Sequence, residues 1–409
     1  MTTHITSHPL DAGDPLAAKR AAFDLPAGVI YLDGNSLGAL PAHVPARVEE
    51  VVRTQWGTSL IRAWNTHGWV EMQRRIGDRI GRLVGAAPGQ IVAGDSTSIN
   101  LFKVLAAALA LRPERKVILS DTGNFPTDLY MAQGLRDLLG QGHELRLVAP
   151  EEVADAIDES IAVTMITQVD YRTGRRHDMK DLTARAHAAG AIAIWDLAHS
   201  AGAFQVELDA CQADFAIGCG YKYLNGGPGA PAFVYVAERH HATAVQPLAG
   251  WHGHDAPFAF DLDYRPAHGV DQMKVGTPPV LSMAALEAAL EVFDDVDMTA
   301  LRAKSVSLCE LFIREVESRC EGLVLASPRN ADQRGSQVSF RFPEGYALMQ
   351  ALIARGVIGD FRAPDIVRFG FTPLYVSHAD VIAAVDILAD ILATRAWDRP
   401  EYKTRAKVT

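Results

Sequence analysis

The stretch that decides the fold is Ala191-Ile-Ala-Ile-Trp-Asp196-Leu-Ala-His199, with Cys219-Gly-Tyr221-Lys222-Tyr-Leu-Asn-Gly226 farther along the chain. The start of the first stretch is apolar and predicts a buried strand that ends in an acid. A second strand pattern, Asp214-Phe-Ala-Ile-Gly218, ends just before a lysine in a loop of small residues. Because each polar residue follows a strand, we expect both at the carboxyl edge of a parallel sheet, where ligands bind.

An acid and a lysine in this arrangement suit pyridoxal 5'-phosphate (PLP). A lysine amine holds the aldehyde of that cofactor as a Schiff base, and a carboxylate keeps the pyridine nitrogen protonated. The pattern therefore predicts chemistry at an amino acid, with Lys222 attached to the cofactor and Asp196 beside its ring nitrogen. The alternatives are a surface lysine and an acid that caps a following helix.

Composition limits the class of protein. The chain has 409 residues, of which 48% are hydrophobic, so it is globular and long enough for two domains. Its formal net charge of -10 argues against nucleic acid as a partner, since a phosphate backbone requires a basic face. A local cationic pocket for a small anion remains compatible with this balance.

The cysteines, the N-terminus and the histidines indicate a cytoplasmic protein without a metal. The four cysteines form no CxxC pair, which fits a reducing compartment. The start of the chain lacks the basic and apolar regions of a signal peptide, and no apolar run could span a bilayer. His252-Gly-His254 has no acid or cysteine at ligand-like spacing, so we expect no metal site there.

Strand and helix patterns alternate over the first three quarters of the chain, which predicts an α/β fold with a mostly parallel sheet. A smaller α+β domain follows. The expected domains are an arm over 1–45, a large cofactor-binding domain over 46–295 and a small domain over 296–409. The expected strands are Lys116–Ser120, Ile161–Val169, Ala191–Asp196, Asp214–Gly218, Ala232–Val236, Leu323–Ala326, Gln337–Phe342 and Ile366–Phe369, and the helices are Asn100–Leu111, Pro126–Leu139, Leu182–Ala189, Met298–Arg319 and His378–Arg395.

Eight short motifs follow one another along the chain. They are Tyr31-Leu-Asp-Gly-Asn-Ser-Leu-Gly38, Asp95-Ser-Thr-Ser-Ile-Asn100, Phe125-Pro-Thr-Asp128, Asp196-Leu-Ala-His199, Tyr221-Lys222-Tyr-Leu-Asn-Gly-Gly-Pro-Gly229, Gly250-Trp251, Val275-Gly-Thr-Pro-Pro279 and Arg368-Phe-Gly-Phe-Thr-Pro-Leu-Tyr375. Each is weak alone, but together and in this order they resemble the kynureninases, PLP enzymes of the aspartate-aminotransferase fold. Thr127 departs slightly, because the family often has serine there.

The resemblance implies hydrolysis of L-kynurenine, with its 3-hydroxy form as an alternative substrate. It implies a role in tryptophan catabolism through the kynurenine pathway, which also serves NAD biosynthesis. It implies a homodimer, with Trp251 and Thr277 offered to a neighbouring subunit's site. Lys222 and Tyr221 become the catalytic residues, one carrying a proton at Cα and the other donating a proton late in the reaction. The implied cofactor contacts are Thr97, Ser98, Phe125, Pro126, Thr127, Asp128, Thr167, Asp196, His199, Tyr221, Lys222, Trp251 and Thr277.

The resemblance also implies the substrate contacts. Arg368 would bind the substrate carboxylate, because a planar guanidinium grips a carboxylate through two parallel hydrogen bonds. Trp64, Gly276 and Thr277 match the bacterial pattern, which favours kynurenine over its 3-hydroxy form. A pocket built to bind a hydroxyl usually provides a polar side chain for it.

Other PLP proteins are the competing interpretations. A cysteine desulfurase needs a mobile nucleophilic cysteine, and the corresponding stretch, 330–337, contains none. Motifs alone do not exclude an aminotransferase. A PLP-binding regulator would carry a DNA-binding domain, whereas the enzyme-like pattern here begins by residue 31 and the chain is acidic.

Overall fold

The structure is a computed structural model that describes residues 7–405. Residues 1–6, at the start of the expected arm and of the segment tested for a signal peptide, lie outside the described residues, as do 406–409 at the C-terminal tail. The chain forms two compact units. The larger contains residues 44–171 and 177–290, and the smaller contains the described residues up to 43, 172–176 and those from 291 onward. The three-part domain division stays a prediction.

The larger unit is built on a seven-stranded sheet with the order β2-β8-β7-β6-β5-β3-β4. Strands β4, β3, β5, β6 and β7 are parallel, and β8 runs antiparallel to both of its neighbours. This is the α/β architecture predicted from the alternating pattern. The strands are β2 Ile91–Ala93, β3 Val117–Asp121, β4 Glu144–Val148, β5 Ile161–Thr167, β6 Ile192–Asp196, β7 Phe215–Gly218 and β8 Phe233–Val236.

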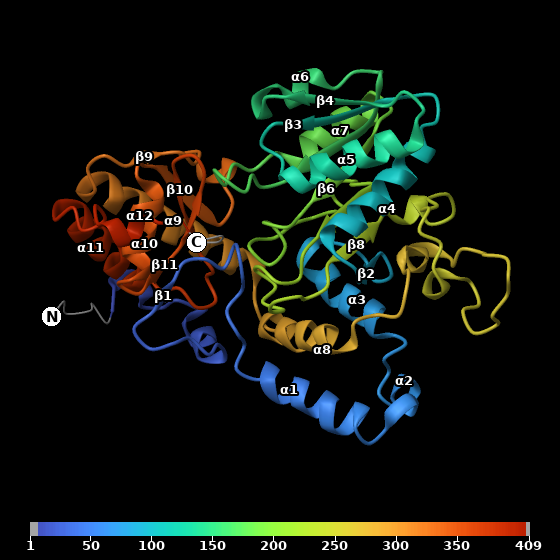
Figure 1. The fold of residues 1–409 in the computed structure, drawn as a ribbon, viewed down its shortest axis with the longest axis horizontal. Helices are drawn as coiled ribbons and strands as arrows, with labels where there is room; N and C mark the ends of the chain where they lie inside the picture. The colour runs from blue at the N-terminus through green and yellow to red at the C-terminus, as the bar shows by residue number, and fades with distance from the viewer. Residues whose placement is uncertain (1–6, 406–409) are drawn as a thin grey trace. The chain divides into compact units, whose positions relative to one another are not determined.

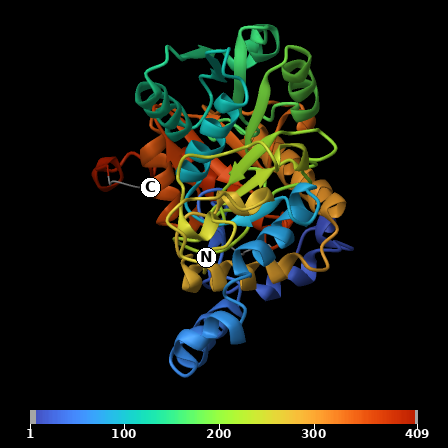
Figure 2. The ribbon, with the colours of Figure 1, turned by 90° about the vertical axis from the view of Figure 1, so that its right-hand side faces the viewer.

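Helices lie on both sides of this sheet (Figures 1 and 2). The helices of the larger unit are α1 Val44–Glu50, α2 Ala63–Thr66, α3 Met72–Val84, α4 Thr97–Ala110, α5 Pro126–Leu139, α6 Val153–Ala156, α7 Met179–Ala188 and α8 Val280–Ala289. Of these, α1 packs on α8 rather than on the sheet. A π-helical stretch, Val51–Trp56, and single 3-10 turns at Leu60–Arg62, Pro150–Glu152, Glu238–His240, Trp251–Gly253 and Gly269–Met273 connect these elements.

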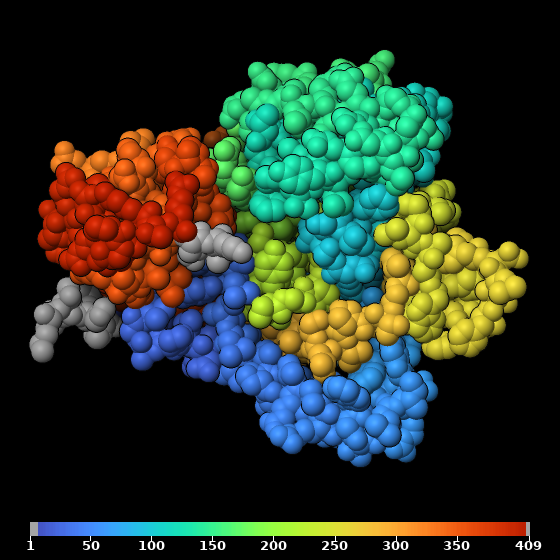
Figure 3. All heavy atoms as spheres, in the orientation of Figure 1, coloured from blue at the N-terminus to red at the C-terminus, as the bar shows by residue number. Residues whose placement is uncertain are grey.

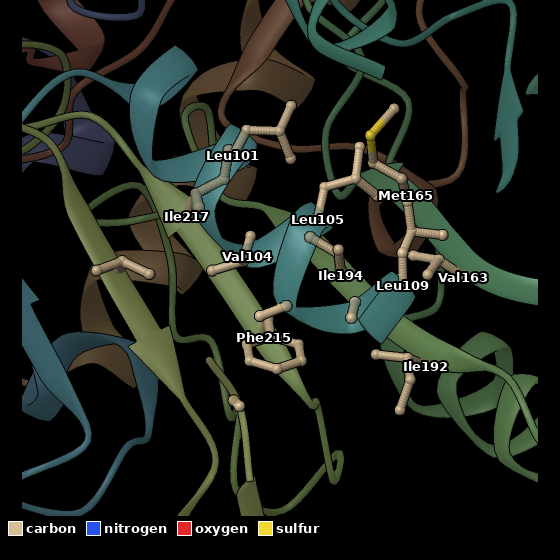
Figure 4. Close-up of a cluster of buried hydrophobic side chains, with 14 of the residues drawn as sticks. Leu101, Val104, Leu105, Leu109, Val163, Met165, Ile192, Ile194, Phe215 and Ile217 are labelled. Atoms are coloured by element: carbon tan, nitrogen blue, oxygen red, sulfur yellow. The ribbon is translucent and has the colours of Figure 1, made fainter. Parts of the chain in front are cut away.

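Helix α4 supplies much of the core of the larger unit. Its apolar side chains recur at helical spacing, so one face is continuously hydrophobic. That face packs on strands β5, β6 and β7 (Figure 4), which fixes the start of α4 beside the carboxyl edge of the sheet. The labelled core residues are Leu101, Val104, Leu105, Leu109, Val163, Met165, Ile192, Ile194, Phe215 and Ile217, all of them buried.

The smaller unit contains a four-stranded antiparallel sheet, β12-β13-β10-β9, and a parallel pair, β1-β11. The pair joins the N-terminal segment to the C-terminal part of the chain, since Ile30 and Val357 are register partners. The strands are β1 Ile30–Tyr31, β9 Val324–Leu325, β10 Gln337–Arg341, β11 Val357–Ile358, β12 Asp360–Arg362 and β13 Ile366–Gly370, and the helices are α9 Met298–Arg319, α10 Gly345–Ile353, α11 His378–Ala393 and α12 Pro400–Lys403, with 3-10 turns at Pro9–Asp11, Ala17–Ala22 and Ala331–Gln333. A 3-10 turn at Leu290–Phe293 spans the boundary between the units.

The predicted strands and helices are present, with ends that differ by a few residues. Strand β5 stops at Thr167, two residues before its predicted end, and α11, the last of the predicted helices, stops at Ala393. Among the strands, the sequence patterns did not predict β2, which has only three residues, or β4, which is half exposed and therefore lacks an apolar run. The short strands β1, β11 and β12 were not predicted either. Among residues 7–405, no helix combines the length and apolar character needed to cross a membrane.

Candidate active site

The carboxyl ends of the parallel strands bring the predicted residues together. Asp196 is the last residue of β6, Thr167 is the last residue of β5, and Lys222 follows β7 by a short loop. Neighbouring parallel strands end at one edge of a sheet, so these side chains converge although they are far apart in sequence. The register confirms the geometry for two of them, because Thr167 and Asp196 are direct partners across β5 and β6.

A cavity of about 530 Å³ lies at this edge, and every residue that lines it belongs to the larger unit. Ten of the predicted site residues are among its lining: Thr97, Ser98, Phe125, Thr127, Asp128, Thr167, Asp196, His199, Tyr221 and Lys222. The predicted contact Pro126 occupies the first position of α5, between two lining residues, but does not itself line the cavity.

The lysine is held in a tightly packed loop. Lys222 Nζ lies 2.9 Å from His199 Nε2 and 5.8 Å from the centre of the Tyr221 ring. Close neighbours fix the loop at two glycines: a Cβ at Gly220 would lie 2.4 Å from the Pro231 carbonyl oxygen, and one at Gly226 would lie 2.7 Å from a Leu286 methyl. Larger residues at either glycine would displace the loop that carries the amine.

Two buried carboxyl groups face the lysine's charge. Burial raises the pKa of Asp128 well above its ordinary value, and the charge of Asp196 raises it further, whereas Lys222 lowers it. Burial also raises the pKa of Asp196, opposed by Lys222 and by the Ala198 N–H, which donates to Asp196 Oδ1 at 2.8 Å. Asp128 Oδ2 is buried and has no hydrogen-bond partner. A buried carboxyl oxygen of this kind calls for a donor that the cavity can admit.

The start of α4 also lines the cavity. Ser96 caps the helix by accepting from the Ile99 N–H at 3.4 Å, and Thr97 and Ser98 form its first turn. The first N–H groups of a helix point outward and carry a partial positive charge, so a helix of 14 residues suits an anion here. Lining hydroxyls add neutral donors.

Four of the predicted contacts lie elsewhere in the larger unit. Trp64, Trp251, Gly276 and Thr277 do not line this cavity. The two tryptophans instead meet around His252, with ring centroids 5.9 Å from Trp64 and 4.2 Å from Trp251. Their predicted roles in cofactor and substrate binding stay predictions.

Arg368 lies in the smaller unit, on β13, and is buried with a side-chain exposure of 1%. Its Nε donates to Asp360 Oδ1 at 2.7 Å, and its Nη2 donates to the other Asp360 oxygen and, at 2.7 Å, to Ser36 Oγ. The two acidic and basic residues are register partners on β12 and β13, which explains the bidentate contact. Arg368 thus lies on the predicted strand, and its guanidinium is held in a buried ion pair. Its predicted role in substrate binding stays a prediction.

Several lining residues were not predicted. Tyr171 packs edge-on against Phe125, with ring centroids 5.1 Å apart and an angle of 88°. Asp95 and Ser96 precede α4, and Cys219 precedes the lysine loop. For Tyr171 and Cys219 the available signal was their position after the predicted strands that form β5 and β7, because the loops after strands build the ligand site of such folds. Asp95 and Ser96 follow β2, which was not predicted.

Comparisons with known proteins agree with the resemblance that the sequence motifs show. Residues 301–388 match the model of the kynureninase C-terminal domain. A protein named kynureninase from Burkholderia pseudomallei (strain 1106a) is 54% identical over 416 aligned positions, covering 100% of both chains. A protein of the same name from Pseudomonas fluorescens is 53% identical over the same lengths.

Solved structures confirm the fold. A cysteine desulfurase from Thermococcus onnurineus NA1 superposes with a TM-score of 0.77 at 20% identity, covering 92% of this chain and 98% of that one. A C-DES mutant with glycine covalently linked to its PLP-cofactor gives a TM-score of 0.78 at 16% identity, over 91% and 99%. At such identities the likeness concerns the fold, which is the PLP-enzyme architecture predicted from the motifs.

Proposed function

Because this chain belongs to the kynureninase family, we propose that it hydrolyses L-kynurenine to anthranilate and L-alanine and uses PLP for this reaction. The observation in the structure that carries the proposal is the cavity at the carboxyl edge of the sheet. It combines one amine, Lys222, with two buried carboxyls, Asp128 and Asp196, and a helix N-terminus. Few ligands call for all of these at once.

The residues fit PLP group by group. The unpartnered oxygen of Asp128 and the buried carboxylate of Asp196 suit a protonated ring nitrogen. The start of α4, with Thr97 and Ser98, suits the phosphate. Phe125 offers a ring at the cavity wall. When bound, the cofactor supplies an electron sink for charge that develops at the substrate's Cα and Cβ.

The protein's own contribution is proton transfer and positioning. Lys222 would hold the cofactor and, with its amine free, would take the proton from the substrate's Cα. His199 lies 2.9 Å from its Nζ and orients the amine. Burial, together with Cys219 and Asp196, raises the pKa of Tyr221 above its ordinary value, so this phenol stays protonated and is suited to donate. Water then attacks the γ-carbonyl, and the bond between Cβ and Cγ breaks.

Substrate recognition is assigned to residues outside this cavity. We propose from the family resemblance that Arg368 binds the substrate carboxylate, although its Nε and Nη2 donate to Asp360 in this structure. Trp64, Gly276 and Thr277 contribute to the aryl pocket and favour kynurenine over 3-hydroxykynurenine. Comparison of kcat/KM for the two substrates tests this preference, and a clear advantage for the hydroxylated one would contradict it.

A cysteine desulfurase is not supported, although such enzymes share the fold. The nucleophile of such a reaction is a thiolate, which forms at low pKa and with solvent access. Burial raises the pKa of both Cys309 and Cys320 to about 11. Burial also raises the pKa of Cys219 in the cavity. Sulfide release from cysteine would overturn this assignment.

We assign a homodimer on the basis of an exposed apolar segment. Residues 251–268 form a projecting part of the larger unit, yellow in Figure 3. Phe258 is 61% exposed, Phe260 76% and Leu262 102%, which is an unusual concentration of apolar surface for a monomer. Trp251 and Thr277 lie on or near this segment and would reach a neighbouring subunit's site. Sedimentation of Leu262→Lys as a monomer would support the assignment, and sedimentation of the variant as a stable dimer would contradict it.

The function is tested by mixing the PLP-loaded protein with L-kynurenine and recording anthranilate fluorescence. We expect equal amounts of anthranilate and alanine from the wild type and none from Lys222→Ala. Lys180→Ala is the matched control, because Lys180 is an exposed lysine on α7 outside the cavity. Transfer of the amine to an oxo acid in place of alanine release would identify an aminotransferase. The proposed setting is tryptophan catabolism in the cytoplasm.

A further inference from the structure

Lys103 is the second lysine near the cavity, and the proposed chemistry does not use it. It lies on α4, and its side chain is 1% exposed. Side chains on a helix tilt toward its N-terminus, so the ammonium lies back at the first turn. There Nζ donates to Asp95 Oδ2 at 2.8 Å and to the Met273 carbonyl oxygen at 2.6 Å. A buried ammonium is costly unless such partners compensate it.

Asp95 gives a reason for the burial of the Lys103 ammonium. It lines the cavity, its carboxylate is 32% exposed, and it directly precedes the Ser96 cap of α4. Its backbone has a φ of 52°, a conformation that a residue other than glycine rarely adopts. A carboxylate fixed at this point would repel a dianion at the helix start. The wall that suits a phosphate therefore contains a negative charge that must be balanced.

The second partner connects Lys103 to a different segment. Met273 ends the turn Gly269–Met273, and Val275 follows it closely. The Val275 carbonyl accepts from the His252 N–H at 3.2 Å, which joins this segment to the turn that carries Trp251. One ammonium group thus ties the start of α4 to the segment that leads to the predicted contacts at 276 and 277.

We propose that Lys103 is a positioning residue for the cofactor phosphate: it cancels the charge of Asp95 and fixes the α4 start against Met273, so that this wall accepts a dianion. The inference rests on PLP as the cofactor but not on kynurenine as the substrate. Burial lowers the pKa of the Lys103 ammonium, and the adjacent Asp95 carboxylate favours the charged form.

The test measures binding to the apoprotein and needs no turnover. PLP and pyridoxal, which lacks the phosphate, are titrated separately, and Schiff-base absorbance is recorded. Lys103→Met should weaken PLP binding by about tenfold or more and leave the affinity for pyridoxal within about threefold, because only PLP meets the uncompensated carboxylate. Restoring charge balance in the double variant Asp95→Asn/Lys103→Met should recover most of the affinity for PLP.

Controls separate this role from a structural one. Lys304→Met removes another buried lysine, whose Nζ lies 2.7 Å from Asp14 Oδ2 in the smaller unit, and should not distinguish PLP from pyridoxal. Asp95→Asn alone should bind PLP at least as tightly as the wild type, which keeps the test decisive if Lys103→Met does not fold. Equal losses for PLP and pyridoxal, no loss for PLP, or no recovery in the double variant would overturn the proposal. Failure of kynurenine hydrolysis would leave these binding results unaffected.

Discussion

Replacement of Asp360 by asparagine should expose how strongly the smaller unit depends on one buried ion pair. The side chains of Arg368 and Asp360 are 1% and 2% exposed, and the acid also contacts Arg362 Nη2 at 2.7 Å and accepts from Ser36 Oγ at 2.6 Å. Asparagine keeps one acceptor oxygen and places an NH₂ group against a guanidinium. Removing one member of a buried pair costs about 3–5 kcal/mol, because the remaining charge stays buried without compensation.

The matched control is Asp365→Asn in the same unit. Asp365 pairs with Arg341 at 3.1 Å, but these side chains are 29% and 53% exposed, and exposed pairs contribute about 0–1 kcal/mol. Urea unfolding of the apoproteins, followed by circular dichroism, gives both free-energy differences. A cost for Asp360→Asn no larger than that for Asp365→Asn would refute the reasoning.

The sign of the pH dependence provides an independent check. Burial opposes ionisation of Asp360, but Arg368 and Arg362 hold its pKa below the ordinary value. The group therefore binds fewer protons in the folded state than in the unfolded state. Its contribution to stability is present at neutral pH and is lost as the pH falls through the folded-state pKa. Asp360→Asn should accordingly show a flatter loss of stability toward acid than the wild type.

Two further substitutions test other parts of the fold. Burial and the charge of Asp360 raise the pKa of Asp33 to about 8, so the wild type loses stability as the pH rises from the ordinary aspartate pKa to that value. Asp33→Asn should remove this loss, and its gain in Tm should be larger at about pH 8 than at about pH 5; a constant difference would contradict the shift. Gly77→Ala would place a Cβ 2.1 Å from the Ile91 carbonyl oxygen, where α3 packs on β2. It should lower the unfolding free energy by about 1–3 kcal/mol, and an unchanged urea midpoint would show that the helix can shift.

The parts of the site that the sequence predicts are those that local patterns encode. Apolar runs locate β6 and β7, and the residues after them, Asp196 and Lys222, then follow from the rule that ligands bind at the carboxyl edge. The antiparallel direction of β8 is not encoded in this way, because a fully buried strand looks the same in either direction. Strand direction depends on how the connecting chain returns.

Contacts between residues far apart in the sequence were the other feature that the sequence did not predict. Nothing in the sequence pairs Lys103 with Met273, because the sequence pattern of an apolar helix with one lysine is the same whether the ammonium is paired or solvated. The ion pair of Arg368 and Asp360 likewise depends on the register of β12 against β13. The motif comparison identified the arginine, but its partner emerges only when the strands are aligned.

The pairing of β1 with β11 has a consequence for the order of folding on the ribosome. Ile30 is synthesised before the residues of the larger unit, and its register partner Val357 is synthesised after them. At translation rates of roughly 5–20 residues per second, the N-terminal segment waits on the order of tens of seconds for that strand. The larger unit, whose residues emerge in between, completes its own sheet during this interval. Strand β1 is therefore made before the larger unit but reaches its native pairing only after that unit has been synthesised.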